Sequence, residues 1–156
     1  MKGELDHKLS REIASHPFFH GMDREFVHTL TAGAVERSYA TDDMIAHEGA
    51  EADVLYLVLE GKVALELGAA DRPPITVQTV GSGEIVGWSW LVPPHRWRFS
   101  VRALKPTRLV AIDGGVVRRV LHAHPDWGFQ FMVRFMPVLA ERLENTRIQL
   151  LDIYGR

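Results

Sequence analysis

The sequence predicts a mainly β fold: a barrel, sandwich or jelly roll of short strands between N-terminal helices and a long C-terminal helix. Two patterns predict it. Between about residues 35 and 113, short β-type runs alternate with turn residues. From Asp126 onward, apolar residues recur at helical spacing nearly to the end of the chain. The 156 residues suffice for a single domain, 1–156, with N-terminal helices in 1–33, strands in 34–113 and C-terminal helices in 114–156.

The N-terminal segment predicts two short helices. Residues 5–15 form a polar helical stretch, and Pro17 ends it, because proline interrupts the hydrogen bonding inside a helix. Residues 22–32 then carry Phe26 and Leu30 at helical spacing. Both helices precede the first strand.

The stretch VLYLVLEGKVALEL is the clearest hairpin signal in the chain. Its strands are residues 54–59 and 63–67, and Glu60 and Gly61 stand at the reversal, where glycine readily adopts a positive φ. The other short apolar runs are separated by turn residues in the same way. The remaining predicted strands are residues 36–39, 44–46, 75–80, 99–104 and 108–112, with a loop tip at residues 71–74.

The C-terminal region predicts a short helix over residues 115–122 and, after Pro125, a long helix from Asp126. The long helix shows a heptad a/d pattern over about three heptads, which is typical of a helix that packs against a second chain. We therefore expect a homodimer through this helix, and a helix that packs only within its own monomer is the alternative. The heptad positions are Met132, Met136, Leu139, Leu143, Thr146 and Leu150.

Composition excludes several classes of function. The apolar content of 46%, the charged content of 24% and the net charge of −2 indicate a globular protein without the basic field that gathers nucleic acid or anionic membrane. The chain has no cysteine, no apolar run long enough to span a membrane, and a charged N-terminus unlike a signal sequence, so we expect a cytoplasmic protein. No metal-ligand cluster and no catalytic constellation stands out, so we expect neither a metal site nor an enzyme.

Several short motifs occur in a recognisable order. HPFFHGMDREFVHTL comes first, and the strand pattern continues with Ile45, Glu48, Gly49, Leu55, Tyr56, Val58, Gly61 and Val63. In this order and spacing they resemble the cyclic nucleotide-binding domain, the sensor half of the cyclic AMP receptor protein and its relatives. The resemblance covers roughly residues 16–153 and implies a β-roll, that is, a double-stranded β-helix or jelly roll, with flanking helices. The helix-turn-helix domain of the family's transcription factors does not follow the long helix, so we expect no direct DNA contact.

The resemblance also implies where a ligand would bind. The family's phosphate-binding cassette reads Gly-Glu-Leu, a short helix, then Pro-Arg-x-Ala-(Thr/Ser)-Val. Its glutamate takes the ribose 2′-hydroxyl, and its arginine pairs with the cyclic phosphate. Aligned without a gap, Gly87 takes the glycine position and Ser100 the Thr/Ser position. Trp88 then replaces the glutamate and Trp97 replaces the arginine.

This replacement leaves three interpretations. The indoles fill the nucleotide cavity and leave a ligand-free module for dimerisation or protein interaction. Alternatively, the pocket is altered and takes another small ligand, anionic or apolar. In a register with a gap, cyclic nucleotide binding is kept through Glu84 and Arg96. The candidate pocket residues are Glu84, Gly87, Trp88, Ser89, Trp90, Arg96, Trp97, Arg98 and Ser100.

The residues favour a regulatory sensor domain that does not bind cyclic AMP in the usual way, because an indole cannot compensate a phosphate charge. Such a domain would act through its own dimer or through a regulatory partner protein. The sequence does not identify the ligand, whether a cyclic nucleotide or another small molecule.

Overall fold

The computed structural model describes residues 2–154, apart from the side chains of Ala69 and of residues 153–154. Within this range the chain forms helices at both ends and strands between them. In chain order the elements are α1 (Lys2–Ser15), α2 (Arg24–Thr31), β1 (Ala34–Tyr39), β2 (Met44–Ala46), β3 (Val54–Glu60), β4 (Lys62–Ala69), β5 (Arg72–Gly81), β6 (Ile85–Val86), β7 (Ser100–Ala103), β8 (Thr107–Asp113), α3 (Gly114–Ala123) and α4 (Pro125–Tyr154).

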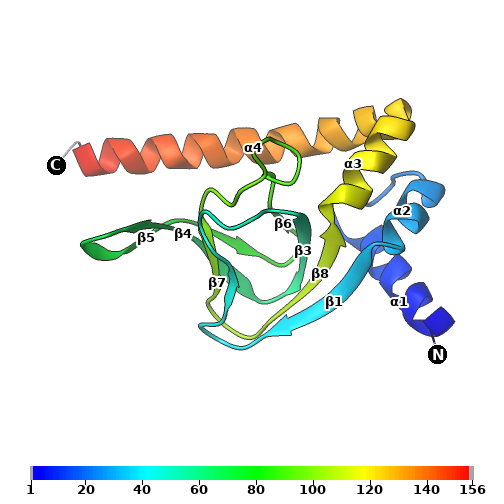
Figure 1. Ribbon diagram of the computed structural model, residues 1–156, viewed down its shortest axis with the longest axis horizontal. Helices are drawn as coiled ribbons and strands as arrows, with labels where there is room; N and C mark the ends of the chain where they lie inside the picture. The colour runs from blue at the N-terminus through cyan, green and yellow to red at the C-terminus, as the bar shows by residue number, and fades with distance from the viewer. Residues whose placement is uncertain (1, 155–156) are drawn as a thin grey trace.

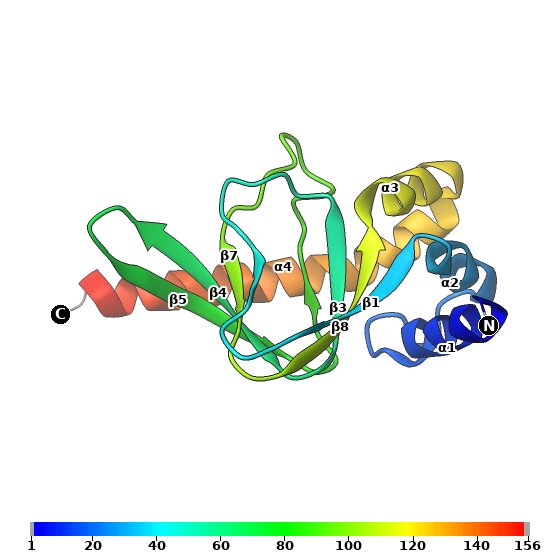
Figure 2. The same ribbon diagram turned by 60° about the horizontal axis from the view of Figure 1, so that its bottom comes forward.

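The strands form two antiparallel four-stranded sheets, in the orders β1-β8-β3-β6 and β2-β7-β4-β5. The sheets face each other as a roll, with α1, α2 and α3 gathered at one end (Figure 1). Both views show α4 running along one side of the roll, with the β4–β5 hairpin beside its C-terminal half (Figures 1 and 2). This arrangement confirms the predicted fold class. In residues 2–154, no helix is both long and apolar enough to cross a membrane.

Two strands differ from the sequence prediction. The fifth strand begins at Arg72, so it includes Pro73 and Pro74 instead of leaving them in a loop. It tolerates both prolines because β5 is an edge strand and because the β4–β5 register is irregular between Leu67 and Ala69, opposite them. The two-residue strand β6 was not predicted, since a run that short carries no periodicity. It pairs with Tyr56 and Leu57 of β3.

The predicted hairpin is present as β3 and β4, and its turn requires glycine. Gly61 has a φ of +105°, and a Cβ atom built on it would lie 2.6 Å from the Cα atom of Thr107. No side chain fits that space, so this turn brings the β3–β4 reversal directly against the start of β8.

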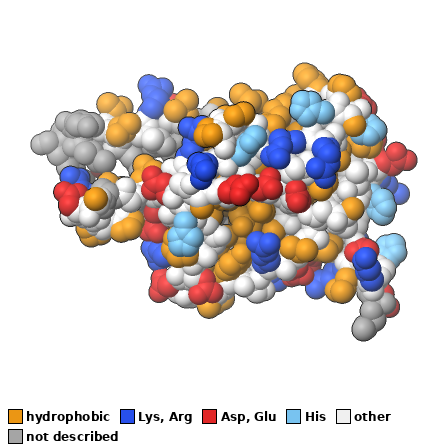
Figure 3. Space-filling view, viewed as in Figure 1, with side chains coloured by type: hydrophobic (Ala, Val, Ile, Leu, Met, Phe, Trp, Pro, Cys, Tyr) orange, Lys and Arg blue, Asp and Glu red, His pale blue; other side chains and the backbone are white. Residues whose placement is uncertain are grey.

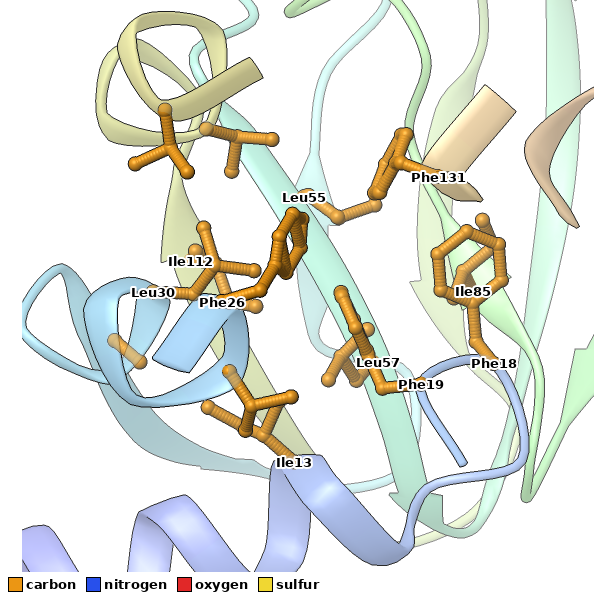
Figure 4. Packing of buried hydrophobic residues seen from close by; sticks show 14 of the residues in the cluster. Ile13, Phe18, Phe19, Phe26, Leu30, Leu55, Leu57, Ile85, Ile112 and Phe131 are labelled. Atoms are coloured by element: carbon orange, nitrogen blue, oxygen red, sulfur yellow. The ribbon is translucent and has the colours of Figure 1, made fainter. Parts of the chain in front are cut away.

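A first cluster of buried residues, which we call the helix-side cluster, joins the helices to the sheet of β3 and β8. Figure 4 shows Phe19 and Phe26 turned toward β3, where Leu55 and Leu57 meet them. α4 contributes a fully buried Phe131, whose ring centroid lies 5.2 Å from that of Phe18. The helix-side cluster consists of Ile13, Phe18, Phe19, Phe26, Val27, Leu30, Ala34, Leu55, Leu57, Ile85, Trp90, Val110, Ile112, Val117, Val120, Trp127, Phe131 and Phe135.

A second cluster, the roll-interior cluster, fills the space between the two sheets. It takes side chains from the inward faces of both sheets and from the segment before β7. Its members are Ala46, Ala52, Tyr56, Val58, Val63, Leu65, Val80, Val86, Trp97, Phe99, Val101, Leu109 and Ala111. The two clusters together hold α4 and the roll in one packed body.

His16 is a polar side chain buried at the junction of α1 and the sheet. Its Nδ1 atom accepts a hydrogen bond of 3.2 Å from the backbone N–H of Phe18. Its Nε2 atom lies 3.2 Å from the carbonyl oxygen of Val58, so the neutral ring satisfies both neighbours when Nε2 carries the proton. Burial lowers the pKa of His16, although backbone hydrogen bonds oppose the shift.

We predict that His16 makes the protein less stable as the pH falls below about 6.5. The unfolded chain then binds a proton at this residue, while the native state, with its depressed pKa, does not. The contribution of one such group cannot exceed about 1.4 kcal/mol per pH unit. Urea unfolding of wild type and His16→Gln between pH 7.5 and 5.5 measures it. The variant should show the shallower pH dependence, and equal slopes would contradict the assignment.

Candidate functional site

Trp97 lies in the roll interior, at the position where the resemblance places a phosphate-binding arginine. Its side chain is 6% exposed. The indole stacks on Tyr56 with ring centroids 6.0 Å apart, and it meets Phe99 edge-on at 5.9 Å. Gly87 makes room for it, since a Cβ atom on this glycine, whose φ is +107°, would lie 3.2 Å from the indole. Trp97 therefore fills the roll beside the cassette.

Trp88 takes a different position, at the border between the two clusters. It is half-buried and packs against both of them. The guanidinium carbon of the exposed Arg98 lies 4.9 Å from the centre of its ring, a cation–π contact that leaves the arginine on the surface. Trp88 is the one predicted pocket residue that also lines the cavity described below.

The remaining predicted pocket residues are engaged elsewhere. Trp90 is fully buried in the helix-side cluster, where its Nε1 donates to the Gly87 carbonyl at 2.8 Å. Ser89 beside it is buried as well. Ser100 accepts a hydrogen bond from the Glu48 N–H at 2.9 Å. The cassette therefore does not gather these side chains around one ligand position.

The two charged residues of the gapped register also lie away from that position. Glu84 is exposed, and its Oε2 accepts a hydrogen bond of 2.7 Å from the Gly81 N–H in the preceding turn. Arg96 is exposed too, and it donates to the Gly49 carbonyl at 3.0 Å. Neither residue lines the cavity beside Trp88.

A cavity of about 340 Å³ lies between the β4–β5 hairpin and α4. Its volume is at the lower end of the range for small-molecule sites. Most of its wall is apolar, and α4 forms one side. The lining residues are Leu65, Leu67, Val77, Gln78, Trp88, Phe99, Leu139, Arg142, Leu143 and Thr146.

Arg142 is the only charged residue among those that line the cavity. It is 9% exposed, and one of its Nη atoms donates to the carbonyl oxygen of Ile85. Its Nε–H is buried and has no hydrogen-bond partner among the described residues. Desolvation lowers the pKa of Arg142 to about 10, against the opposing fields of Glu84 and Glu141, so the side chain still carries its charge at neutral pH.

The sequence prediction did not include Arg142, although a signal for it exists. The buried row of α4 runs through Phe131, Phe135 and Val138, with steps of 4 and 3, and the next step of 4 reaches Arg142. An arginine on the buried row of a helix is a recognisable departure from amphipathic patterning.

The outward side of α4 carries an apolar stripe that differs from the predicted heptad seam. Met136, Leu143 and Leu150 of that seam are exposed, by 56%, 65% and 48%. The other three predicted seam residues face the roll, because Phe131 and Phe135 set the inward side of the helix close to them. Met132 and Leu139 pack on the helix-side cluster, and Leu139 and Thr146 line the cavity.

Two further residues complete this outward stripe, Phe129 and Val133, which are exposed by 70% and 55%. The apolar stripe, Phe129, Val133, Met136, Leu143 and Leu150, advances by 4, 3, 7 and 7 residues, so it keeps a heptad repeat. Figure 3 shows hydrophobic side chains recurring along the edge of the molecule where Figure 1 places α4.

Comparison with known proteins gives one family match. The profile of the family described as "Cyclic nucleotide-binding domain" matches residues 36–124. The cAMP-activated global transcriptional regulator CRP of Pasteurella multocida is 25% identical over 124 residues, which are 76% of this chain and 57% of that protein. The chain therefore spans less than two thirds of the length of this relative.

Solved structures show the same fold. A cyclic nucleotide-binding protein from Geobacter metallireducens GS-15 is 30% identical, with a TM-score of 0.76 over 86% of this chain and 97% of that one. A cyclic nucleotide-binding domain from Methylobacillus flagellatus KT is 22% identical, with a TM-score of 0.78 over 93% and 84%. At 22% identity, the similarity to the Methylobacillus flagellatus domain shows a shared fold and nothing more.

We predict that Trp97 contributes more to stability than Trp88. Trp97→Ala removes an indole that the roll packs on all sides, which typically lowers the free energy of unfolding by about 3–5 kcal/mol. Trp88→Ala, on a half-buried residue beside a cavity, should lower it by about 1–2 kcal/mol. Urea denaturation of both variants measures the two losses. Equal losses, or the reverse order, would mean that the roll does not depend on Trp97.

Proposed function

Because the chain belongs to the cyclic nucleotide-binding domain family, we propose that it is a sensor domain that binds a small molecule between the roll and α4. We further propose that it acts through a homodimer formed by the apolar stripe of α4. The observation that carries the proposal is the position of the cavity, whose wall is shared between the roll and the helix that bears the stripe.

A ligand in this cavity would contact the output helix directly. α4 contributes Leu139, Arg142, Leu143 and Thr146 to the wall, and the opposite wall comes from the sheet and from Trp88. Leu143 belongs to both the cavity and the stripe. A ligand that contacts the helix better in one position than in another shifts the population between them, and the stripe moves with the helix.

The side chains around the cassette support a ligand other than a cyclic nucleotide in its usual pose. That pose needs an acid for the ribose and an arginine for the phosphate. Trp97 fills the arginine position, and the acid Glu84 is bonded to the neighbouring turn. Among the described residues, none that lines the cavity is acidic.

The apolar stripe supports the homodimer. Five large apolar side chains, each 48–70% exposed, lie at heptad spacing on one side of the helix. Exposed apolar surface of this kind typically marks an interaction site. A second copy presents the same stripe, so a two-fold pairing of α4 with α4 would cover both.

We predict that Met136→Asp converts the dimer to a monomer. Met136 lies in the stripe but not in the cavity, and a two-fold axis would place two aspartates near each other in an apolar seam. Leu5→Asp on α1 is the matched control, because Leu5 is 62% exposed and lies outside the stripe. Light scattering should give a dimer for wild type and the control. A monomeric wild type at high micromolar concentration would contradict the homodimer.

We also predict that millimolar cyclic AMP and cyclic GMP leave the melting temperature unchanged. A ligand at 100 times its Kd would stabilise the protein by about 2.7 kcal/mol, which a melting curve detects easily. Saturable stabilisation by cyclic AMP would contradict this prediction. If Glu84→Gln and Arg96→Gln each removed that stabilisation, the nucleotide would bind through Glu84 and Arg96, as the alignment with a gap implies.

A further inference from the structure

Arg142 differs from Arg102 and Arg108, two arginines that also tie parts of the fold together. Arg102 makes two hydrogen bonds to Glu66, of 3.0 and 3.1 Å, and Arg108 binds Glu36 at 2.6 Å. Arg142, in contrast, has no carboxylate in ion-pair contact among residues 2–154, and its guanidinium donates to the neutral carbonyl of Ile85. The most deeply buried of these three charges is therefore the one without a counterion.

Such a buried charge is unfavourable unless an anion lies beside it. Moving a cation from water into a protein interior costs several kcal/mol, and only a close opposite charge with good hydrogen-bond geometry offsets the loss. Glu84 and Glu141 act on Arg142 through space without contacting it. The free Nε–H adds an unsatisfied donor to the same wall. Both deficits would be met by one anionic group inside the cavity.

The other lining residues indicate the chemical character of the rest of the ligand. Leu65, Leu67, Val77, Leu139 and Leu143 are aliphatic, and Trp88 and Phe99 offer aromatic surfaces. Only the Thr146 hydroxyl and the Gln78 amide are polar besides Arg142, and the hydroxyl already donates to the Arg142 carbonyl at 2.9 Å. A ligand with several polar groups would find few partners in such a cavity, whereas an apolar body would find many.

We propose that the cavity binds an apolar carboxylic acid, aromatic or aliphatic, whose carboxylate is held by Arg142 while its body packs on Trp88, Phe99 and the leucines. This inference rests on the proposed function, for which it names the ligand class. A guanidinium is well suited to the task, because its planar fork matches the two oxygens of a carboxylate.

The test uses three acids and their primary amides, which differ in charge but hardly in shape: 2-naphthoate, 4-phenylbutyrate and decanoate. Binding is followed by tryptophan fluorescence, to which Trp88 in the cavity wall contributes, and by melting temperature. At least one acid should bind wild type about 10-fold more tightly than its amide, a difference equivalent to about 1.4 kcal/mol.

Arg142→Gln should abolish the preference for the acid over the amide. Arg147→Gln is the matched control, because it makes the same change on the same helix at an exposed residue, which pairs with Glu144 at 3.1 Å. Arg142→Lys keeps the charge without the fork and should retain a weaker preference. It also keeps the test decisive if Arg142→Gln does not fold.

The outcomes separate this inference from the proposed function. An acid that binds Arg142→Gln and wild type equally well overturns the role of Arg142. If no acid binds while cyclic AMP gives a saturable response, the sensor function stands and the ligand class is wrong. If neither the acids nor the cyclic nucleotides bind, both proposals fail, and the chain acts as a ligand-free module.

Discussion

The packing of α4 against the rest of the molecule is the constraint on which the site depends. Phe131 and Phe135 are almost completely buried, and Trp90 lies 5.8 Å from each of their rings. These contacts set which side of the helix faces the roll, and the residue two turns beyond Phe135 lies on that same side. That residue is Arg142. The aromatic contacts therefore place the Arg142 charge in an apolar wall, although burying a charge there is unfavourable.

The same packing explains why the indoles of the cassette separate instead of forming one pocket. Trp90 is drawn toward Phe131 and Phe135, while Trp97 faces the opposite way, onto Tyr56. Arg96 and Arg98 alternate with Trp97 and Phe99, so both arginines remain on the surface. Trp90 and Trp97 of the cassette are part of the core. The open space lies against α4, and Trp88 is the cassette residue that lines it.

Much of the fold could be predicted from the sequence, because it depends on local patterns. The hairpin around Gly61 follows from a positive-φ turn between two apolar runs, and the long helix follows from heptad spacing. The strand over Pro73 and Pro74 could not be predicted, since only the sheet order shows that β5 is an edge. The two-residue β6 is specified by its partner β3 and not by its own residues.

The site was less predictable for a related reason. A heptad repeat on α4 is compatible with several registers, and only the tertiary contacts of Phe131 and Phe135 decide that Leu139 and Thr146 face the roll. The burial of Arg142 was not predicted, because an arginine in a helix is normally exposed and only the structure shows that its neighbours on the same side are buried. The substitution of Trp88 and Trp97 for charged residues was visible in the alignment with the family's motif. The alignment did not indicate where each indole ring would pack.

We propose that the charge of Arg142 serves to bind a ligand and does not stabilise the fold. The free energy of unfolding of Arg142→Met, measured without ligand against wild type, tests it most directly. Methionine has a similar length and no charge to desolvate, so the account predicts a variant at least as stable as wild type, by as much as about 1–4 kcal/mol. A variant less stable than wild type by several kcal/mol would show that the arginine supports the fold and would contradict the account.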